Sequence, residues 1–195
     1  MYRRFFKRFL DVVLSLMGLI VLAVPMLIVA LVIKLDSPGP VIFRQERLGR
    51  NGTVYWMYKF RSMKVGAEHT GSGVYSGKGD ERVTKVGRFL RASSIDELPQ
   101  LLNVLRGDMS LIGFRSPLTY HPWPWEEYTD EQRKMFTVRP GITGWAQVNG
   151  LRGDTSIEER VKYDIWYIEN WSIWLDVKIL LMTAFGGMVN PEKIK

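Results

Sequence analysis

Two adjacent carboxylates, Asp96 and Glu97, are the side chains of this sequence best suited to do chemistry. They follow Ser94, and a serine with a glutamate three residues later is the pattern of a capping box at the start of a helix. We therefore expect both acids in a first helical turn, where the helix field lowers their pKa values and keeps them ionised. Acids in a first turn also commonly do no more than complement the helix dipole.

A helix start that carries two carboxylates has a chemical use. Helix N-termini attract anions, and two adjacent carboxylates can hold a hard cation such as Mg²⁺. Together they would draw a diphosphate toward an ionised Asp96, and an aspartate can act as a nucleophile on phosphorus. Basic residues elsewhere in the chain could neutralise the phosphoryl charge. They are Lys59, Arg61, Arg88, Arg91 and Arg139.

Several other kinds of catalytic site are excluded by composition and motif. The chain has 195 residues, two histidines and no cysteine, which excludes disulfide frameworks, thiolate nucleophiles and cysteine metal sites. It has no Walker A loop, no G-x-G-x-x-G, no H-E-x-x-H and no G-x-S-x-G motif. A mechanism driven by histidine is therefore disfavoured.

The longest apolar segment, residues 12–33, contains no charged residue. A helix of that length extends about 33 Å, enough to cross the hydrocarbon core of a bilayer. Pro25 lies near its middle, where it removes a helical hydrogen bond. Basic residues flank both ends, and such residues stay on the cytoplasmic side. The pattern favours a re-entrant helix that enters and leaves one leaflet, with a spanning helix, a cleaved signal and a buried core helix as alternatives.

The net charge of +7 is concentrated beside that segment. Residues 1–65 hold 11 basic and 3 acidic side chains, whereas residues 66–195 hold 16 and 17. Because the basic excess adjoins an apolar run, anionic lipid headgroups explain it better than nucleic acid does.

The rest of the chain predicts a mostly helical α+β fold. Residues 41–47 and 53–60 flank Asn51-Gly52 and predict a small β-hairpin, and the Gly/Ser-rich residues 66–80 predict a mobile loop. Trp166, Trp171 and Trp174 favour either an amphipathic helix at a membrane interface or a Trp-rich core, and could support a homodimer. We expect helices over residues 82–107, 129–135, 156–168 and 175–188.

Four strings of the sequence are long and specific: residues 58–63, 91–100, 103–110 and 138–147. With these strings and the later pattern from Asp164 to Asp176, nearly the whole chain resembles the small monotopic polyprenyl-phosphate phosphoglycosyltransferases of the bacterial sugar transferase family. The resemblance implies transfer of a sugar-1-phosphate from a nucleoside diphosphate sugar, usually a UDP-sugar, to polyprenyl phosphate. This step would start a glycan on its lipid carrier at the cytoplasmic face of the bacterial inner membrane.

The resemblance also implies an organisation and residue roles. Residues 1–36 would form the re-entrant membrane helix, and residues 37–195 a catalytic domain with interfacial helices, as one functional unit. Asp96 would be the catalytic nucleophile that forms a covalent phosphosugar intermediate. Glu97, the second catalytic residue, would mainly bind Mg²⁺, with Asp96 as a second ligand, and would also take part in proton transfer. The residues expected near substrate phosphates are Lys59, Arg88, Arg91, Arg115, Arg139 and Asp164.

The sequence departs from the family pattern at two places. The helix break reads Val24-Pro25 where the family often has Ser-Pro, and residues 114–117 read Phe-Arg-Ser-Pro where it usually has Pro-Arg-Pro. The motifs do not identify the sugar. The rival interpretation is a non-catalytic membrane anchor that binds anionic lipid through its basic N-terminus and needs neither Asp96 nor a divalent metal.

Overall fold

The computed structural model describes residues 2–70, 79–151 and 155–186. Its helices are α1 (Tyr2–Asp36), α2 (Lys85–Ser93), α3 (Gln100–Arg106), α4 (Asp130–Arg133), α5 (Trp145–Val148), α6 (Ile157–Glu169) and α7 (Ile173–Gly186). Its strands are β1 (Ile42–Leu48), β2 (Val54–Phe60), β3 (Ser110–Ile112) and β4 (Gly141–Thr143). β1 and β2 pair antiparallel and β3 and β4 pair in parallel, so the described residues hold two small sheets among helices. The expected mostly helical α+β class is confirmed.

The β1–β2 hairpin forms where the sequence predicted it. Asn51 and Gly52 in its turn both have positive φ angles, 55° and 76°, which suits the Asn-Gly pair. Tyr55 and Met57 on β2 are buried, while Trp56 between them is exposed, as strand alternation requires. The buried side chains pack on α3, so the hairpin is fixed to the helix that follows the acid pair.

The prediction of a single helix over residues 82–107 is wrong in one respect. The chain forms α2 and α3, with the 3₁₀ turn η3 (Ile95–Glu97) between them. Ser94 ends α2 in the left-handed conformation, with φ 59°, and Pro99 has no amide hydrogen with which to continue an α-helical ladder. The acid pair therefore lies in a short connection between two helices. The predicted end at Gly107 is confirmed, since Gly107 caps α3 with φ 94°.

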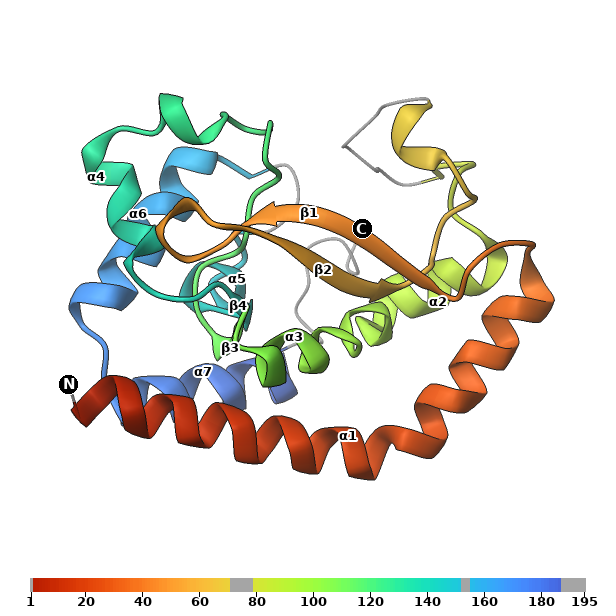
Figure 1. Ribbon diagram of the computed structural model, residues 1–195, viewed down its shortest axis with the longest axis horizontal. Coiled ribbons are helices and arrows are strands. Elements are labelled where there is room, and N and C mark those ends of the chain that lie inside the picture. The colour runs from red at the N-terminus through yellow and green to blue at the C-terminus, as the bar shows by residue number, and fades with distance from the viewer. Residues whose placement is uncertain (1, 71–78, 152–154, 187–195) are drawn as a thin grey trace.

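α1 is a long helix that contains Pro25. It runs along one edge of the molecule and bends part-way (Figure 1). We attribute the bend to Pro25, because proline cannot donate a helical hydrogen bond and its ring clashes with the preceding turn. Val24 before it has an exposed side chain.

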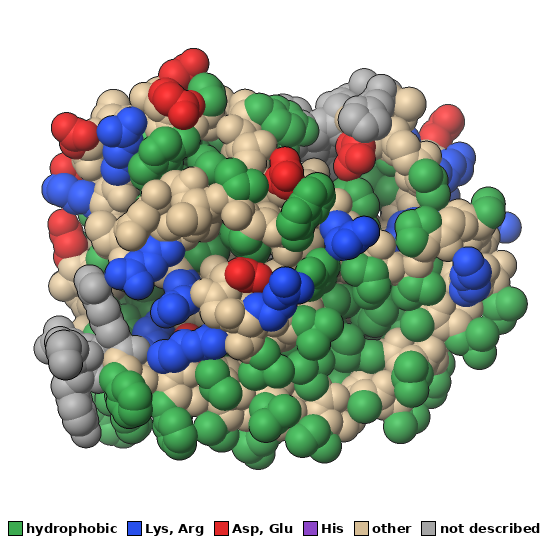
Figure 2. Space-filling view, in the orientation of Figure 1, with side chains coloured by type: hydrophobic (Ala, Val, Ile, Leu, Met, Phe, Trp, Pro, Cys, Tyr) green, Lys and Arg blue, Asp and Glu red, His purple; other side chains and the backbone are tan. Residues whose placement is uncertain are grey.

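One face of α1 packs on α3, α2 and β3, and the opposite face is exposed. Hydrophobic side chains gather along this edge, and Lys and Arg side chains gather beside it (Figure 2). By length and composition, α1 is the one helix within the described residues that could cross a membrane. Because most of its apolar stretch is exposed, α1 is not the core helix of a soluble fold.

Polar contacts hold both ends of α1 to the rest of the protein. Near the start, Lys7 Nζ lies 2.7 Å from Asp176 on α7. The buried Asp11 accepts hydrogen bonds from the Ser110 hydroxyl and the Leu111 amide on β3, both at 3.0 Å. Just beyond the last turn, the buried guanidinium of Arg61 donates to the carbonyls of Ser37, at 2.7 Å, and Pro38. The two ends of α1 are thus fixed to one domain.

The tryptophans of the C-terminal helices differ in their surroundings. Trp166 stacks on Trp145 at 5.2 Å between ring centroids, and Trp171 Nε1 donates to Asp176 at 3.0 Å. Trp174, by contrast, is 82% exposed at the start of α7. Ile173, Val177, Leu181 and Phe185 on the same helix are exposed as well. α7 thus begins two residues earlier than predicted and carries an apolar surface of its own.

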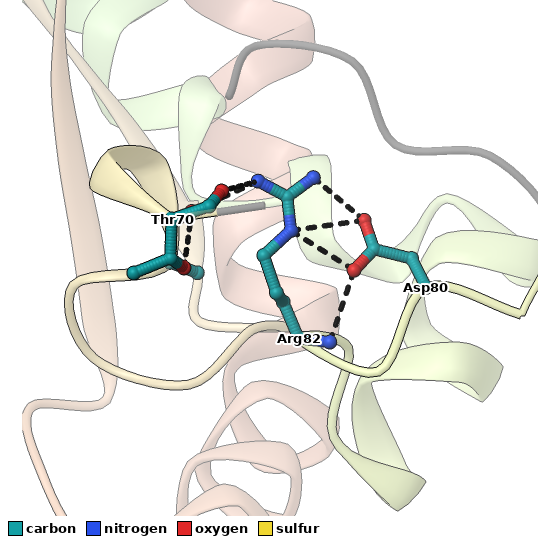
Figure 3. Close-up of polar contacts among 4 residues, drawn as sticks. Thr70, Asp80 and Arg82 are labelled. Atoms are coloured by element: carbon teal, nitrogen blue, oxygen red, sulfur yellow. Dashed lines mark hydrogen bonds and ion pairs between the residues drawn. The ribbon is translucent and has the colours of Figure 1, made fainter. Parts of the chain in front are cut away.

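The predicted mobile loop lies partly outside the described residues, which omit 71–78. Arg82 connects the parts of the segment that are described. Its guanidinium donates to the carbonyls of Ala67 and Thr70, at 2.9 and 2.6 Å, and pairs with the carboxylate of Asp80 at 2.7 Å (Figure 3). These contacts place residues 67–70 beside residues 80–82 next to the cavity described below.

Candidate active site

A cavity of about 1320 Å³ opens between the hairpin, the acid pair and α6. Its wall includes Lys59 and Arg91 as well as Asp96 and Glu97. Arg115, in the loop after β3, and Asp164, on α6, line the same cavity. Six of the residues predicted to act together are thereby brought around one cavity.

The backbone at the acid pair differs from the expected helix start. Ser94 makes no side-chain cap, because its left-handed conformation ends α2 rather than beginning the next helix. The predicted capping box is therefore wrong. Asp96 and Glu97 instead lie on η3, whose short 3₁₀ turn places both acids at the cavity wall.

The environment of Asp96 reverses the predicted pKa shift. Burial, and next the negative charge of Glu97, raise the pKa of Asp96 to about 6, against the opposing charges of Lys59, Arg91 and Arg115. Only 9% of Asp96 is exposed. The expectation of a lowered pKa is wrong because loss of solvation outweighs the nearby positive charges. At neutral pH this carboxylate is ionised yet poorly solvated, which suits a nucleophile.

Glu97 joins three distant parts of the chain. Its carboxylate lies 2.8 Å from Lys59 Nζ on β2 and 3.8 Å from Arg115 Nη1. Arg115 sits between two buried residues, Phe114 and Ser116, which occupy the positions where the sequence departs from the family pattern. Phe114 packs edge-on against Phe136, and these contacts fix the loop that carries Arg115.

Two of the predicted phosphate-binding residues do not line this cavity. Arg88 is exposed on α2, one turn before Arg91. Arg139 donates from Nε to the Gly107 carbonyl at 2.7 Å, at the C-terminal end of α3. Spacing in the sequence could not separate these two arginines from Arg91, because helix orientation and loop path decide which basic side chains reach the acids.

Asp164 lies in α6 and is 3% exposed. Burial raises its pKa to about 8, although the backbone amide of Arg115 and the charges of Arg160 and Arg115 act in the opposite direction. Its Oδ1 atom has no hydrogen-bond partner among the described residues. Asp164 is therefore a protonated acid at neutral pH, a state that the sequence did not indicate.

Arg47 on β1 is among the cavity residues that sequence reasoning did not select. Its guanidinium donates from Nε and Nη2 to Gln45 Oε1, at 3.1 and 2.6 Å, and from Nη1 to the Ser116 carbonyl at 2.9 Å. Burial, and then the charge of Arg115, lower the pKa of Arg47 to about 10. The available signal was the strand period, which puts Gln45 and Arg47 on one face of β1.

The donor set at this site suits Mg²⁺. The described residues contain no group of three or more His, Asp or Glu side chains that could enclose an ion. Two adjacent carboxylates at one cavity wall are nevertheless what Mg²⁺ uses when substrate phosphates and water complete its shell. Asp96 and Glu97 are the residues that would hold it.

Comparison with known protein families identifies the family of this chain. The family model described as "Bacterial sugar transferase" matches residues 2–190. This chain belongs to the bacterial sugar transferase family. The resemblance stated from its sequence motifs is thereby confirmed.

Three relatives illustrate the range of this sugar transferase family. "UDP-glucose:undecaprenyl-phosphate glucose-1-phosphate transferase" of Escherichia coli (strain K12) is 46% identical over 191 residues, covering 96% of this chain and 41% of that protein. A protein of the same name from Caulobacter vibrioides is 48% identical, covering 91% of this chain and 68% of that protein. "Exopolysaccharide production protein PSS" of Rhizobium leguminosarum bv. phaseoli is 43% identical, covering 95% and 96%. This sugar transferase thus spans less than half of the length of some curated relatives that it matches.

The raised pKa of Asp164 predicts an unusual dependence of stability on pH. The unfolded chain ionises this acid near its ordinary pKa of 3.8 and the folded chain near 8, so folding binds a proton between these values. Stability contributed by this group is therefore lost as pH rises from about 4 to 8. In Asp164→Asn a neutral amide replaces the titrating acid, so this decrease in stability does not occur. The melting temperature of the variant should therefore exceed that of the parent protein by at least about 3 °C at pH 8.

This difference should shrink at pH 5, and thermal unfolding at both pH values measures it. Asp130→Asn serves as the matched control, because Asp130 is fully exposed at the start of α4. Parallel pH profiles for the parent protein and Asp164→Asn would contradict a buried, protonated Asp164.

Proposed function

We propose that this sugar transferase moves a sugar-1-phosphate from a UDP-sugar to undecaprenyl phosphate, with Asp96 as the covalent nucleophile. The observation that carries the proposal is a buried, ionised aspartate beside Glu97 in a cavity lined by basic side chains. The names of two relatives, which specify UDP-glucose and undecaprenyl phosphate, support glucose as the sugar. The reaction would yield undecaprenyl-diphosphate-sugar and UMP and would begin exopolysaccharide assembly.

In the first step, a carboxylate oxygen of Asp96 attacks the phosphorus that bears the sugar. A bond forms between that oxygen and phosphorus, and the bond from phosphorus to the bridging oxygen breaks. The electron pair leaves with UMP, so the step needs no proton transfer from the protein. Lys59, Arg91 and Arg115 supply the positive charge that offsets the charge on the phosphoryl oxygens.

In the second step, a phosphate oxygen of undecaprenyl phosphate attacks the same phosphorus. The bond to Asp96 breaks, and the electron pair returns to its carboxylate. Two transfers at one phosphorus allow a single cavity to serve a soluble donor and a lipid acceptor in turn. Bound Mg²⁺ would neutralise phosphate charge at Asp96 and Glu97.

The attachment of α1 supports a re-entrant membrane helix. A helix that crossed the bilayer would place its two ends on opposite sides of about 30 Å of hydrocarbon. Here Lys7 near one end and the carbonyl of Ser37 at the other both contact the same domain. The exposed apolar faces of α1 and α7 would then lie in one leaflet of the bacterial inner membrane, with the cavity on its cytoplasmic side.

A non-catalytic anchor is the alternative function. Anionic lipid binding through the basic N-terminus would explain α1, but it would not require a buried acid pair facing a cavity. Burial of an ionised carboxylate destabilises a fold, and such a cost is typical of a functional site.

The proposed reaction predicts the effect of Asp96→Asn. With UDP-glucose, undecaprenyl phosphate and Mg²⁺, UMP release by the parent protein should fall at least about 1000-fold in the variant, because an amide does not attack phosphorus. The variant should remain folded, since the amide removes a buried charge. Asp130→Asn is the control and should keep the parent rate, because Asp130 is exposed. Equal UMP release by Asp96→Asn and the parent protein would refute the nucleophile.

The re-entrant helix predicts that both ends of α1 face the cytoplasm. The chain has no cysteine, so single cysteines at Tyr2 and Leu35 can be labelled in spheroplasts with a membrane-impermeant maleimide. Neither position should react until the cells are lysed. Val21→Cys, in the exposed apolar face, should stay unlabelled even after lysis without detergent. Labelling of one end alone in intact spheroplasts would establish a spanning helix instead.

A further inference from the structure

A second, smaller space adjoins the active-site cavity. This hollow, of about 10 Å³, has room for roughly one water molecule. Four charged side chains line both the hollow and the cavity: Arg47, Lys59, Glu97 and Arg115. Because the two spaces share these residues, the hollow marks the point where the four side chains converge.

The charges around this hollow do not balance. Glu97 is the acid among them, and it is already contacted by Lys59 at 2.8 Å and by Arg115 at 3.8 Å. Among the residues that the structure describes, Arg47 forms no direct ion pair; the charge of Glu97 reaches it from a distance, and its guanidinium is held by neutral oxygens of Gln45 and Ser116. Asp96 in the cavity wall is a second carboxylate near Lys59 and Arg115. Arg47 is the cation of this group whose hydrogen bonds go to neutral oxygens, so an anionic ligand beside it would offset its charge.

The hydrogen bonds of Arg47 leave part of its guanidinium available. A guanidinium has five N–H groups, and the contacts with Gln45 and Ser116 use three of them. One N–H on Nη1 and one on Nη2 remain. Two such donors on the terminal nitrogens match the spacing of two phosphate oxygens, which is why arginine binds phosphate in a bidentate way.

We propose that Arg47, together with Arg115, binds a substrate phosphate where the hollow meets the active-site cavity. This inference rests on the proposed transferase reaction and adds a residue to it. Gln45 and Ser116 act as positioning residues, since their oxygens fix the plane of the Arg47 guanidinium. The crowding of Arg47 by Arg115, which lowers the pKa of the former, is relieved when a phosphate lies between them.

The phosphate can come from two sources in this reaction, the diphosphate of the UDP-sugar or the monophosphate of the lipid acceptor. Both carry phosphate oxygens to which the two terminal nitrogens of Arg47 can donate hydrogen bonds. They differ in the step at which the site is filled, so separate KM values for donor and acceptor distinguish them.

The test uses two variants of Arg47. Arg47→Lys keeps the positive charge but loses the pair of terminal guanidinium nitrogens, and Arg47→Met removes both the charge and these donors. Lys162→Met is the control for loss of one positive charge, because Lys162 is exposed on α6 away from the cavity. Affinities for UMP and for inorganic pyrophosphate are measured by calorimetry without turnover, so they do not depend on identifying the sugar. KM values for UDP-glucose and undecaprenyl phosphate are then measured on the full chain in detergent.

We expect Arg47→Lys to weaken phosphate binding about 10-fold and Arg47→Met about 100-fold, with melting temperatures near that of the parent protein. A rise in the KM for UDP-glucose and a loss of UMP and pyrophosphate affinity would assign the site to the donor. A rise confined to the KM for undecaprenyl phosphate would assign it to the acceptor. Unchanged affinities and KM values in folded Arg47 variants would overturn the proposal, whether or not the transferase activity itself is found.

Discussion

The ion pair between Lys59 and Glu97 is the contact on which the architecture depends. It joins the end of strand β2 to the short connection between α2 and α3, two segments 38 residues apart in the chain. The next residues on the same strand extend this joint: Phe60 is buried in a core cluster with Ile33 of α1, and Arg61 holds the carbonyls at the end of α1. Three consecutive residues thus connect the acid pair, the core and the apolar helix, so the exposed apolar edge and the acid pair have a fixed position relative to each other.

Burial of charged groups at this site destabilises the fold and prepares the site to bind and react with a phosphate. Asp96, Asp164 and Arg47 each have a pKa shifted against their charged form, and in each case burial is the largest cause. Water would solvate these groups better than the protein does. A phosphate that enters the cavity would supply negative charge close to Arg47 and Arg115. In the proposed reaction, the Asp96 carboxylate becomes part of a mixed anhydride, and its negative charge then lies on the phosphoryl oxygens, which basic side chains surround. Substrate binding would therefore offset part of the free energy by which burial of these charged groups destabilises the fold.

Much of the fold could be predicted because local patterns set it. The Asn51-Gly52 turn, the long apolar helix and the cap at Gly107 all follow from residues close in sequence. The capping box at Ser94 failed because the same residues also suit a left-handed helix end, and neighbouring packing chooses between the two. The raised pKa of Asp96 and the role inferred for Arg47 depend on burial and on Ser116, 69 residues away, and no local pattern carries that information.

In the proposed reaction, Asp96 becomes covalently attached to the sugar phosphate before any lipid acceptor binds. The most direct measurement is the intact mass of the purified chain after brief incubation with UDP-glucose and Mg²⁺ and no undecaprenyl phosphate. A covalent route through Asp96 predicts an added mass of one hexose phosphate, located at Asp96 by peptide mapping and removed when undecaprenyl phosphate is added. An unmodified chain that releases UMP only when undecaprenyl phosphate is present would contradict it, because transfer would then be direct.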